Sequence, residues 1–154
     1  MKASSAMTRE VITVPPELPL SLAWGTMLDH HFRHLPVVVE GKLVGILSDR
    51  DVLLRARYEG GRAIVPNSLV GEAMTLAVTT CRRDSTVESL AALMLERKID
   101  SVPVVDALGV LVGLVTSSDL LALLTRKEGA TALPFDFHLR RVDLGGKLAP
   151  ADAA

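Results

Sequence analysis

The sequence predicts an α/β fold made of two copies of one unit, each ordered strand, helix, strand, strand, helix. Residues 35–51 return in closely similar form as residues 102–119. In both stretches a run of β-branched residues, a turn and a second apolar run predict a short hairpin. Ser48 or Thr116 then stands where a helix should begin, so each hairpin is expected to end in a strand-to-helix turn.

The elements upstream of each hairpin are also repeated. Extended residues 11–14 are followed by two prolines and have a counterpart at residues 78–81. A helix is expected from Pro19, a favourable first-turn residue. Its counterpart begins near residues 84–88, where Ser85 with Glu88, or Asp84 alone, could cap the backbone amides. The buried stripe expected on the first helix comprises Leu20, Ala23, Trp24, Met27, Leu28 and His31.

The remaining segments carry weaker patterns. Residues 1–6 are expected to form a ragged end, and residues 58–68, rich in Gly, Pro and Asn, a flexible connection. Residues 134–140 alternate apolar and polar like a half-buried strand. Residues 145–154 are expected to lack structure.

Composition excludes several classes of protein. The chain has 154 residues, 49% of them hydrophobic, which is enough for a real core. Its 17 basic and 18 acidic residues give a net charge of −1, so the electrostatic footprint of a nucleic-acid binder is missing. No apolar run approaches membrane-spanning length, and the first ten residues lack a signal-peptide core. The single Cys81 is interpreted as a buried small residue, and we expect a cytoplasmic protein.

The duplicated hairpins with the motif Gly-apolar-apolar-Ser/Thr-x-x-Asp resemble the CBS domain, found as tandem pairs called Bateman modules. The motif stands at residues 45–51 and 113–119, each with an upstream Met-Thr segment and an amphipathic helix. The resemblance implies CBS repeats at residues 7–58 and 74–126, packed with pseudo-twofold symmetry, and a C-terminal tail at residues 127–154.

The resemblance also implies adenosine-nucleotide sites in clefts between the repeats. Carried over by position, the binding residues in the first copy are Ser48, Asp51, Arg33 and His34, with Arg50 beside them in sequence. In the second copy they are Thr116 and Asp119. The second copy departs from the basic pattern, because Asp100 and Ser101 stand where the first has Arg33 and His34.

The chemistry of the turn is compatible with this interpretation. The two acceptor oxygens of a carboxylate can take the hydrogen bonds of both ribose hydroxyls, and a nearby hydroxyl can donate or accept. Free amides of the first helical turn could bind phosphate. The same Ser/Thr-x-x-Asp pattern also predicts a capping box, in which both side chains only satisfy the helix's own amides.

Other kinds of site have less support. His30 and His34 are four residues apart, which would suit a metal on a helix, but Pro36 should end the helix and no acidic third ligand follows. Gly45 and Gly113 are interpreted as positions where backbones approach closely. No catalytic triad, nucleophile elbow or Walker sequence is present, so no enzymatic activity is expected.

With the ligand that the resemblance implies, we expect a regulatory sensor of AMP, ADP or ATP that requires no cofactor and acts on an unknown effector protein or through self-association. The alternative is a structural interaction module with unoccupied clefts. Consecutive apolar residues at 120–124 and 52–54 point all round a helix, so a homodimer is expected. Nucleic acid and membrane are not expected partners.

Overall fold

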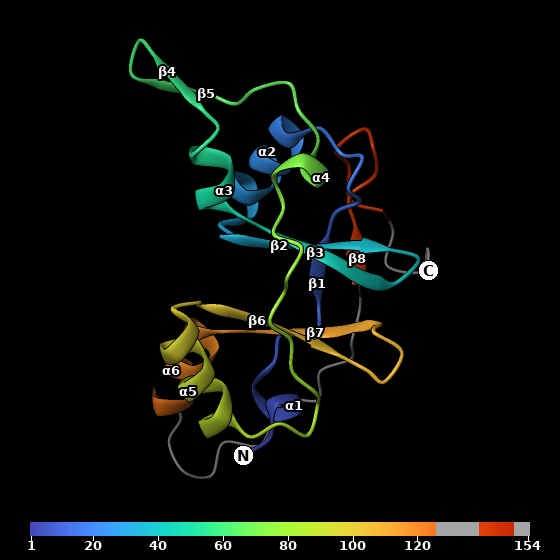
Figure 1. The fold of residues 1–154 in the computed structure, drawn as a ribbon, viewed down its shortest axis with the longest axis vertical. Coiled ribbons are helices and arrows are strands. Elements are labelled where there is room, and N and C mark those ends of the chain that lie inside the picture. The colour runs from blue at the N-terminus through green and yellow to red at the C-terminus, as the bar shows by residue number, and fades with distance from the viewer. Residues whose placement is uncertain (126–138, 150–154) are drawn as a thin grey trace. The chain divides into compact units, whose positions relative to one another are not determined.

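The computed structural model describes residues 1–125 and 139–149, with only the backbone described at Leu139. The chain divides into two compact units (Figure 1). We name the unit formed by residues 12–78 and 140–149 the Ser48 unit, and the unit formed by residues 1–11, 79–125 and 139 the Thr116 unit. Each is described by itself.

The Ser48 unit is built on an antiparallel hairpin of β2 (His34–Val39) and β3 (Lys42–Ser48). Glu40 and Gly41 both have positive φ, as a tight two-residue turn requires. Helix α2 (Leu20–His30) precedes the hairpin, and α3 (Asp49–Leu53) follows it directly. A one-turn helix, α4 (Val70–Ala73), also belongs to this unit.

The Thr116 unit repeats this arrangement with β6 (Ser101–Val105), β7 (Leu111–Thr116), α5 (Val87–Arg97) and α6 (Ser117–Thr125). The two hairpins share a register irregularity, at Val37/Val38 and at Val104/Val105. The α/β fold with two such repeats is confirmed. In the second repeat the first strand is reduced to one parallel bridge between Cys81 and Val104.

Each unit takes a Met-Thr segment from the other sequence repeat. Met7 packs on Gly113 and Thr8 bridges Leu114 in the Thr116 unit, whereas Met74 packs on Gly45 and Thr75 bridges Ile46 in the Ser48 unit. A Cβ on either glycine would lie 2.5–2.6 Å from the methionine sulfur. Both glycines therefore permit a close approach, which agrees with the interpretation of their sequence positions.

Residues 1–6 and 139–149 contain more regular structure than expected. Residues 1–6 are not ragged, since α1 (Ala3–Ala6) forms and Ala3 is fully buried. Strand β8 (Leu139–Arg141) pairs with β1 (Val11–Thr13), and buried Val142 bridges Leu148. The expectation of an unstructured segment is thus wrong for residues 145–149. Most of the alternating stretch, residues 134–138, lies outside the described residues.

Residues 58–68 were expected to form a flexible connection and instead contain ordered structure. Strands β4 (Arg57–Glu59) and β5 (Arg62–Ile64) form an antiparallel hairpin around Gly60 and Gly61. In Figure 1 this hairpin extends away from α2 and α3 of its own unit. Its two glycines, both with positive φ, form a turn rather than a flexible connection.

The buried face of α2 differs in part from the predicted stripe. Leu20, Ala23 and Met27 are buried as expected, and Trp24 packs against the same core while half-buried. Leu28 and His31 are exposed, whereas Thr26 is buried. The helix stops at His30, and His31 adopts a left-handed conformation, so the last turn does not continue the stripe.

The cap of α5 also differs from expectation. The N-cap is Thr86, whose side chain accepts a hydrogen bond from Ser89 N. Ser85 Oγ accepts from Arg82 N instead, which stabilises the preceding turn. A neighbouring hydroxyl one residue further along therefore takes the role that Ser85 or Asp84 was expected to have.

Candidate functional site: two strand-to-helix turns

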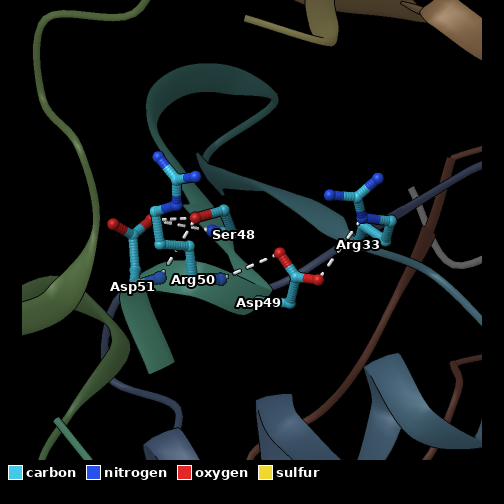
Figure 2. Close-up of polar contacts among 5 residues, drawn as sticks. All are labelled: Arg33, Ser48, Asp49, Arg50 and Asp51. Carbon is cyan, nitrogen blue, oxygen red and sulfur yellow. Dashed lines mark hydrogen bonds and ion pairs between the residues drawn. The ribbon is translucent and has the colours of Figure 1, made fainter. Parts of the chain in front are cut away.

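The first turn joins β3 to α3 and is held by a complete capping box. Ser48 Oγ accepts a hydrogen bond from Asp51 N at 3.1 Å, and Asp51 Oδ2 accepts from Ser48 N at 2.8 Å. The Ser48 hydroxyl also donates to Asp51 Oδ2 at 2.8 Å (Figure 2). The spacing of three residues alone brings these groups together, because residues i and i+3 meet at a helix start.

The second turn, between β7 and α6, repeats this geometry. Asp119 Oδ2 accepts hydrogen bonds from Thr116 N and Thr116 Oγ1, both at 2.7 Å. Thr116 Oγ1 accepts from Asp119 N at 3.2 Å. All four side chains, Ser48, Asp51, Thr116 and Asp119, are half-buried. The capping interpretation of the motif is thus correct for both turns, and it occupies one oxygen of each carboxylate.

The second oxygen of each carboxylate distinguishes the two turns. Among residues 1–125 and 139–149, Asp51 Oδ1 has no hydrogen-bond partner. Asp119 Oδ1 accepts a long hydrogen bond, 3.4 Å, from Thr8 Oγ1. Sequence reasoning did not assign Thr8 to the site, although the repeated Met-Thr pair was a signal for it. A ligand hydroxyl would meet an open acceptor at Asp51 and a partly used one at Asp119.

The amides of the first turn are not free for phosphate, contrary to expectation. Besides Ser48 N and Asp51 N, Asp49 N donates to Arg33 O at 2.9 Å and Arg50 N donates to Asp49 Oδ1 at 2.8 Å. In the second turn Ser117 N donates to Asp100 O at 2.9 Å. An anion at the first turn would therefore depend on side chains and not on the helix terminus.

Two arginines lie beside the first turn. Arg33 Nε is 3.4 Å from Asp49 Oδ2, and the Arg33 side chain is largely exposed. Arg50 is exposed, and its guanidinium bonds none of the described residues. Figure 2 shows both guanidinium groups pointing to the same side of the turn. Asp49 was not among the predicted site residues, but it fixes Arg33.

His34 is placed next to the turn by the register of the hairpin. It opens β2, is half-buried, and pairs with Ser48 across the two strands. The structure thus brings Arg33, His34, Ser48, Arg50 and Asp51 into one neighbourhood. Each is contributed by an end of the β2–β3 hairpin or by the first turn of α3.

The corresponding positions of the second turn have a different charge. Asp100 stands at the position of Arg33, and buried Ser101 pairs with Thr116 as His34 pairs with Ser48. Ser118, in the position of Arg50, is neutral. Around the first turn Arg33 and Arg50 balance Asp49 and Asp51, whereas the second turn has two carboxylates and no cation at the matching positions.

The structure does not place His30 and His34 as a metal-binding pair on one helix. Helix α2 ends at His30, so His30 and His34 do not share a helix face. His30 instead stacks on Phe32, with ring centroids 5.6 Å apart. Among the described residues no three His, Cys, Asp or Glu side chains gather closely enough to hold a metal ion. Within the same residues no helix has the length and apolar character needed to span a membrane.

The two strand-to-helix turns have equivalent hydrogen bonds, and each lies between a hairpin and a helix. They indicate a protein built from a pair of repeats. The model of the CBS domain family matches residues 3–57 and 70–126. The chain belongs to the CBS domain family.

Solved structures of CBS pairs have a similar fold. The CBS domain pair of protein MJ0100 in complex with 5′-methylthioadenosine and S-adenosyl-L-methionine matches with a TM-score of 0.69 and 30% identity, over 81% of this chain and 96% of that chain. The structure of CBSX2 in complex with AMP matches with a TM-score of 0.72 and 26% identity, over 80% and 96%.

Curated relatives include both small proteins and parts of enzymes. The CBS domain-containing protein YhcV of Bacillus subtilis is 33% identical over 80% of this chain and 86% of its own length. Inosine-5′-monophosphate dehydrogenase of Korarchaeum cryptofilum is 36% identical over 97% of this chain, which spans only 31% of that enzyme. The L-aspartate semialdehyde sulfurtransferase of Methanocaldococcus jannaschii is likewise covered over only 25% of its length.

Proposed function

We propose that this chain is a regulatory ligand-sensing module that binds an adenosine-containing ligand at the turns around Asp51 and Asp119. The observation that carries the proposal is that capping uses only Oδ2 of each carboxylate. Within the described part of the chain, Oδ1 of Asp51 accepts no hydrogen bond, and Oδ1 of Asp119 accepts only the long one from Thr8. A ribose supplies two adjacent hydroxyl donors, and one carboxylate oxygen has two lone pairs with which to accept them.

The ligands of similar CBS pairs support an adenosine compound. MJ0100 is described in complex with 5′-methylthioadenosine and S-adenosyl-L-methionine, and CBSX2 with AMP. For the present chain Arg33 and Arg50 favour a phosphorylated ligand such as AMP, ADP or ATP at the first turn, because charge-assisted bonds to phosphate are the strong ones. His34, next to Ser48, is a further candidate contact to phosphate.

Thermal unfolding with added ligand tests the proposal. AMP, ADP, ATP, S-adenosyl-L-methionine and 5′-methylthioadenosine are added separately to the full chain. A ligand at 100 times its dissociation constant adds about 2.7 kcal/mol to the free energy of unfolding. We expect a stabilising shift with at least one of them, lost in the double variant Asp51→Ala/Asp119→Ala.

Loss of a capping box could by itself lower stability, so the experiment needs a matched control. Glu72 also closes the start of a helix, accepting a hydrogen bond from Leu69 N at 2.7 Å, and lies outside both turns. Glu72→Ala should lower the melting temperature and leave the ligand-dependent shift intact. If no ligand shifts the parent protein, or if Glu72→Ala removes the shift equally, the proposed sites are wrong.

A structural interaction module is the second candidate function. It is favoured by the capping bonds, which already satisfy Ser48, Thr116 and the amides of the first turn without any ligand. Under this alternative none of the five compounds changes the melting temperature. The substitution Asp51→Asn distinguishes a capping role of Asp51 from a charged contact with a ligand. The amide oxygen of Asn can still accept the capping hydrogen bonds, but the side chain no longer carries a charge.

The proposed function also includes how ligand binding is passed on. We infer a cytoplasmic homodimer that acts on an effector protein or through its own assembly, with no catalytic turnover and no nucleic-acid partner. Exposed leucines on α6 support the dimer. Hydrolysis of a bound nucleotide by the purified chain would count against the regulatory class.

A further inference from the structure

The β4–β5 hairpin has no role in the turns described above. The family match ends at residue 57 and resumes at residue 70, so most of the hairpin lies outside it. Five of its six strand residues are exposed, including Tyr58 and Ile64, and only Ala63 is half-buried. Neither strand pairs with any other described strand. Both outer edges are therefore left unpaired by the described strands.

The turn determines which backbone groups point outward. Gly60 and Gly61 both have positive φ, which is typical of a type I′ two-residue turn. Glu59 and Arg62 then form the hydrogen-bonded pair next to the turn, and Tyr58 and Ala63 the following non-hydrogen-bonded pair. The N–H and C=O of Tyr58 are consequently directed to the free edge of β4.

The side chains along this edge are self-complementary. Strand β4 reads Arg57, Tyr58, Glu59, and none of the three side chains bonds any of the described residues. If two such strands align antiparallel about a two-fold axis at Tyr58, each Arg57 lies opposite the Glu59 of the other strand. The two tyrosines lie opposite each other at the axis. Opposite charges and aromatic pairs are the favourable cross-strand combinations.

We propose that the outer edge of β4 is an interaction surface for a second copy of this chain, which joins the two hairpins into a four-stranded sheet. Exposed edges are usually protected by charges that repel an incoming strand. Here the alternation of sign attracts an identical strand. The edge of β5 lacks this property, because the same operation would place Arg62 opposite Ile64.

A three-residue strand makes a small interface, so this contact is weak when it acts alone. Stable interfaces bury about 1,200–2,000 Å² in total, more than two short hairpins can supply. The contact gains strength when it links chains that already associate elsewhere, since the second contact then forms at high effective concentration. The pairing requires neither a ligand nor the turns around Asp51 and Asp119.

Disulfide trapping tests the pairing directly. In a Cys81→Ala background, Tyr58→Cys places a thiol at the two-fold axis. Opposite residues of a hydrogen-bonded antiparallel pair have Cα atoms about 5.5 Å apart, within the range of a disulfide.

Ile64→Cys is the matched control, because Ile64 is also exposed on this hairpin but lies on β5, away from the proposed contact. Under mild oxidation we expect linked pairs to form at least tenfold faster in the Tyr58→Cys chain than in the Ile64→Cys chain. Equal rates would overturn the proposal.

Charge exchange tests the register of the pairing. Arg57→Glu and Glu59→Arg, each added to the Tyr58→Cys chain, put like charges opposite each other and should slow trapping about tenfold. The double substitution restores opposite charges and should restore the rate. Arg62→Glu, on β5, should change it little.

A mixture of the two single variants separates loss of pairing from loss of folding. Each single variant repels itself but complements the other, so the mixed disulfide should predominate over both self-linked products. A variant with a disrupted hairpin could not produce this preference. Statistical mixing, or no rescue in the double variant, would contradict the proposed register.

Discussion

At the scale of single residues, the two turns share a capping box and differ in what surrounds it. Among the described residues Asp51 Oδ1 has no hydrogen-bond partner, and two arginines lie beside this turn. Asp119 Oδ1 accepts from Thr8 Oγ1, and Asp100 stands at the sequence position that Arg33 has in the first repeat. Two arginines therefore lie beside the carboxylates of the first turn, while the matching positions of the second turn hold two carboxylates and no arginine. The two turns have the same backbone geometry, but because their surrounding side chains differ we expect them to prefer different ligands.

The first prediction is that the turn at Asp51 favours ATP over AMP relative to the turn at Asp119. A charge-assisted contact to phosphate contributes about 1.5–3 kcal/mol, so selectivity of tenfold or more is expected. Calorimetric titration of ATP and AMP into Asp51→Ala and Asp119→Ala separates the two turns. If both substitutions weaken the binding of ATP and of AMP by the same factor, or if Asp119→Ala alone abolishes ATP binding, the preference for ATP at the Asp51 turn is wrong.

Arginine variants identify the source of this selectivity. Arg50→Gln should weaken ATP more than AMP, because its guanidinium is exposed and bonds none of the described residues. Arg57→Gln removes another exposed arginine, which lies on β4 and not in the turn, and should leave both affinities unchanged.

The second prediction concerns the thiol of Cys81. Burial raises its pKa from 9.0 to about 11. The unfolded thiol therefore loses its proton at lower pH than the folded one, and between about pH 9 and 11 the folded state binds more protons. The free energy of unfolding should fall as pH rises through this window, more steeply than in Cys81→Ala.

Alkylation kinetics check the same residue by a second route. At pH 8 the native thiol should react with iodoacetamide much more slowly than the thiol in urea, because the thiolate is the nucleophile and little of it is present. Equal native and unfolded rates at pH 8 would show that Cys81 is neither buried nor shifted.

At the scale of elements, the short Met-Thr segments join parts of the chain that are distant in sequence. Met7 lies against Gly113 and Thr8 bridges Leu114, so residues near the start of the chain cover the hairpin of the second repeat. Met74 and Thr75 do the same for the first hairpin. Each hairpin thus depends on a segment that the linear repeat pattern assigns to the other copy.

The third prediction is that Gly113→Ala destabilises the protein through Met7. The added Cβ would lie 2.6 Å from the Met7 sulfur, and overpacking of this kind costs about 1–3 kcal/mol. Met7→Ala removes the clash, so the double variant should lose less stability than the sum of the single losses. Urea unfolding measures all three variants.

Gly25 supplies the control for this prediction. It lies inside α2, and apart from its chain neighbours and the backbone of its own helix no described atom lies within 4 Å of an added Cβ. Gly25→Ala should therefore stabilise by about 0.5–1 kcal/mol. Additive losses for Gly113→Ala and Met7→Ala would contradict the contact between them.

At the scale of the whole molecule, the exposed apolar residues of α6 form a candidate interface. Leu121 and Leu124 are 62% and 82% exposed, and no residue of this helix is buried. Leu54, just after α3, is 77% exposed. Apolar surface gathered on an element in this way is typical of an interface.

The fourth prediction is a homodimer in which α6 takes part. Light scattering at micromolar concentration should give twice the chain mass for the parent protein. Leu121→Glu/Leu124→Glu should reduce the mass to that of a monomer, because charge is introduced into an apolar contact. Leu108→Glu changes an equally exposed leucine in the β6–β7 turn and should leave the dimer intact. A monomeric parent protein would exclude this assembly.

The sequence by itself determined the duplicated unit, both hairpins, the starts of α2, α3 and α6, and the neighbourhood of Ser48 with Asp51 and Thr116 with Asp119. These features follow from periodicity, from proline and turn residues, and from pairs three residues apart, so a few adjacent residues decide them. The choice of Thr86 over Ser85 as a cap was missed because adjacent hydroxyls compete with similar propensity.

Only the tertiary structure decided which segment covers which hairpin, that Thr8 bonds Asp119, and that Asp49 N in the first turn donates to Arg33 O. It also placed Val142 in the core of the Ser48 unit and ordered the β4–β5 hairpin. These features join residues that are far apart in the chain or depend on a backbone path that no local pattern encodes. Their physical reason is packing: a methionine fits over a glycine, and a carboxylate accepts from whichever donor the folded chain brings to it.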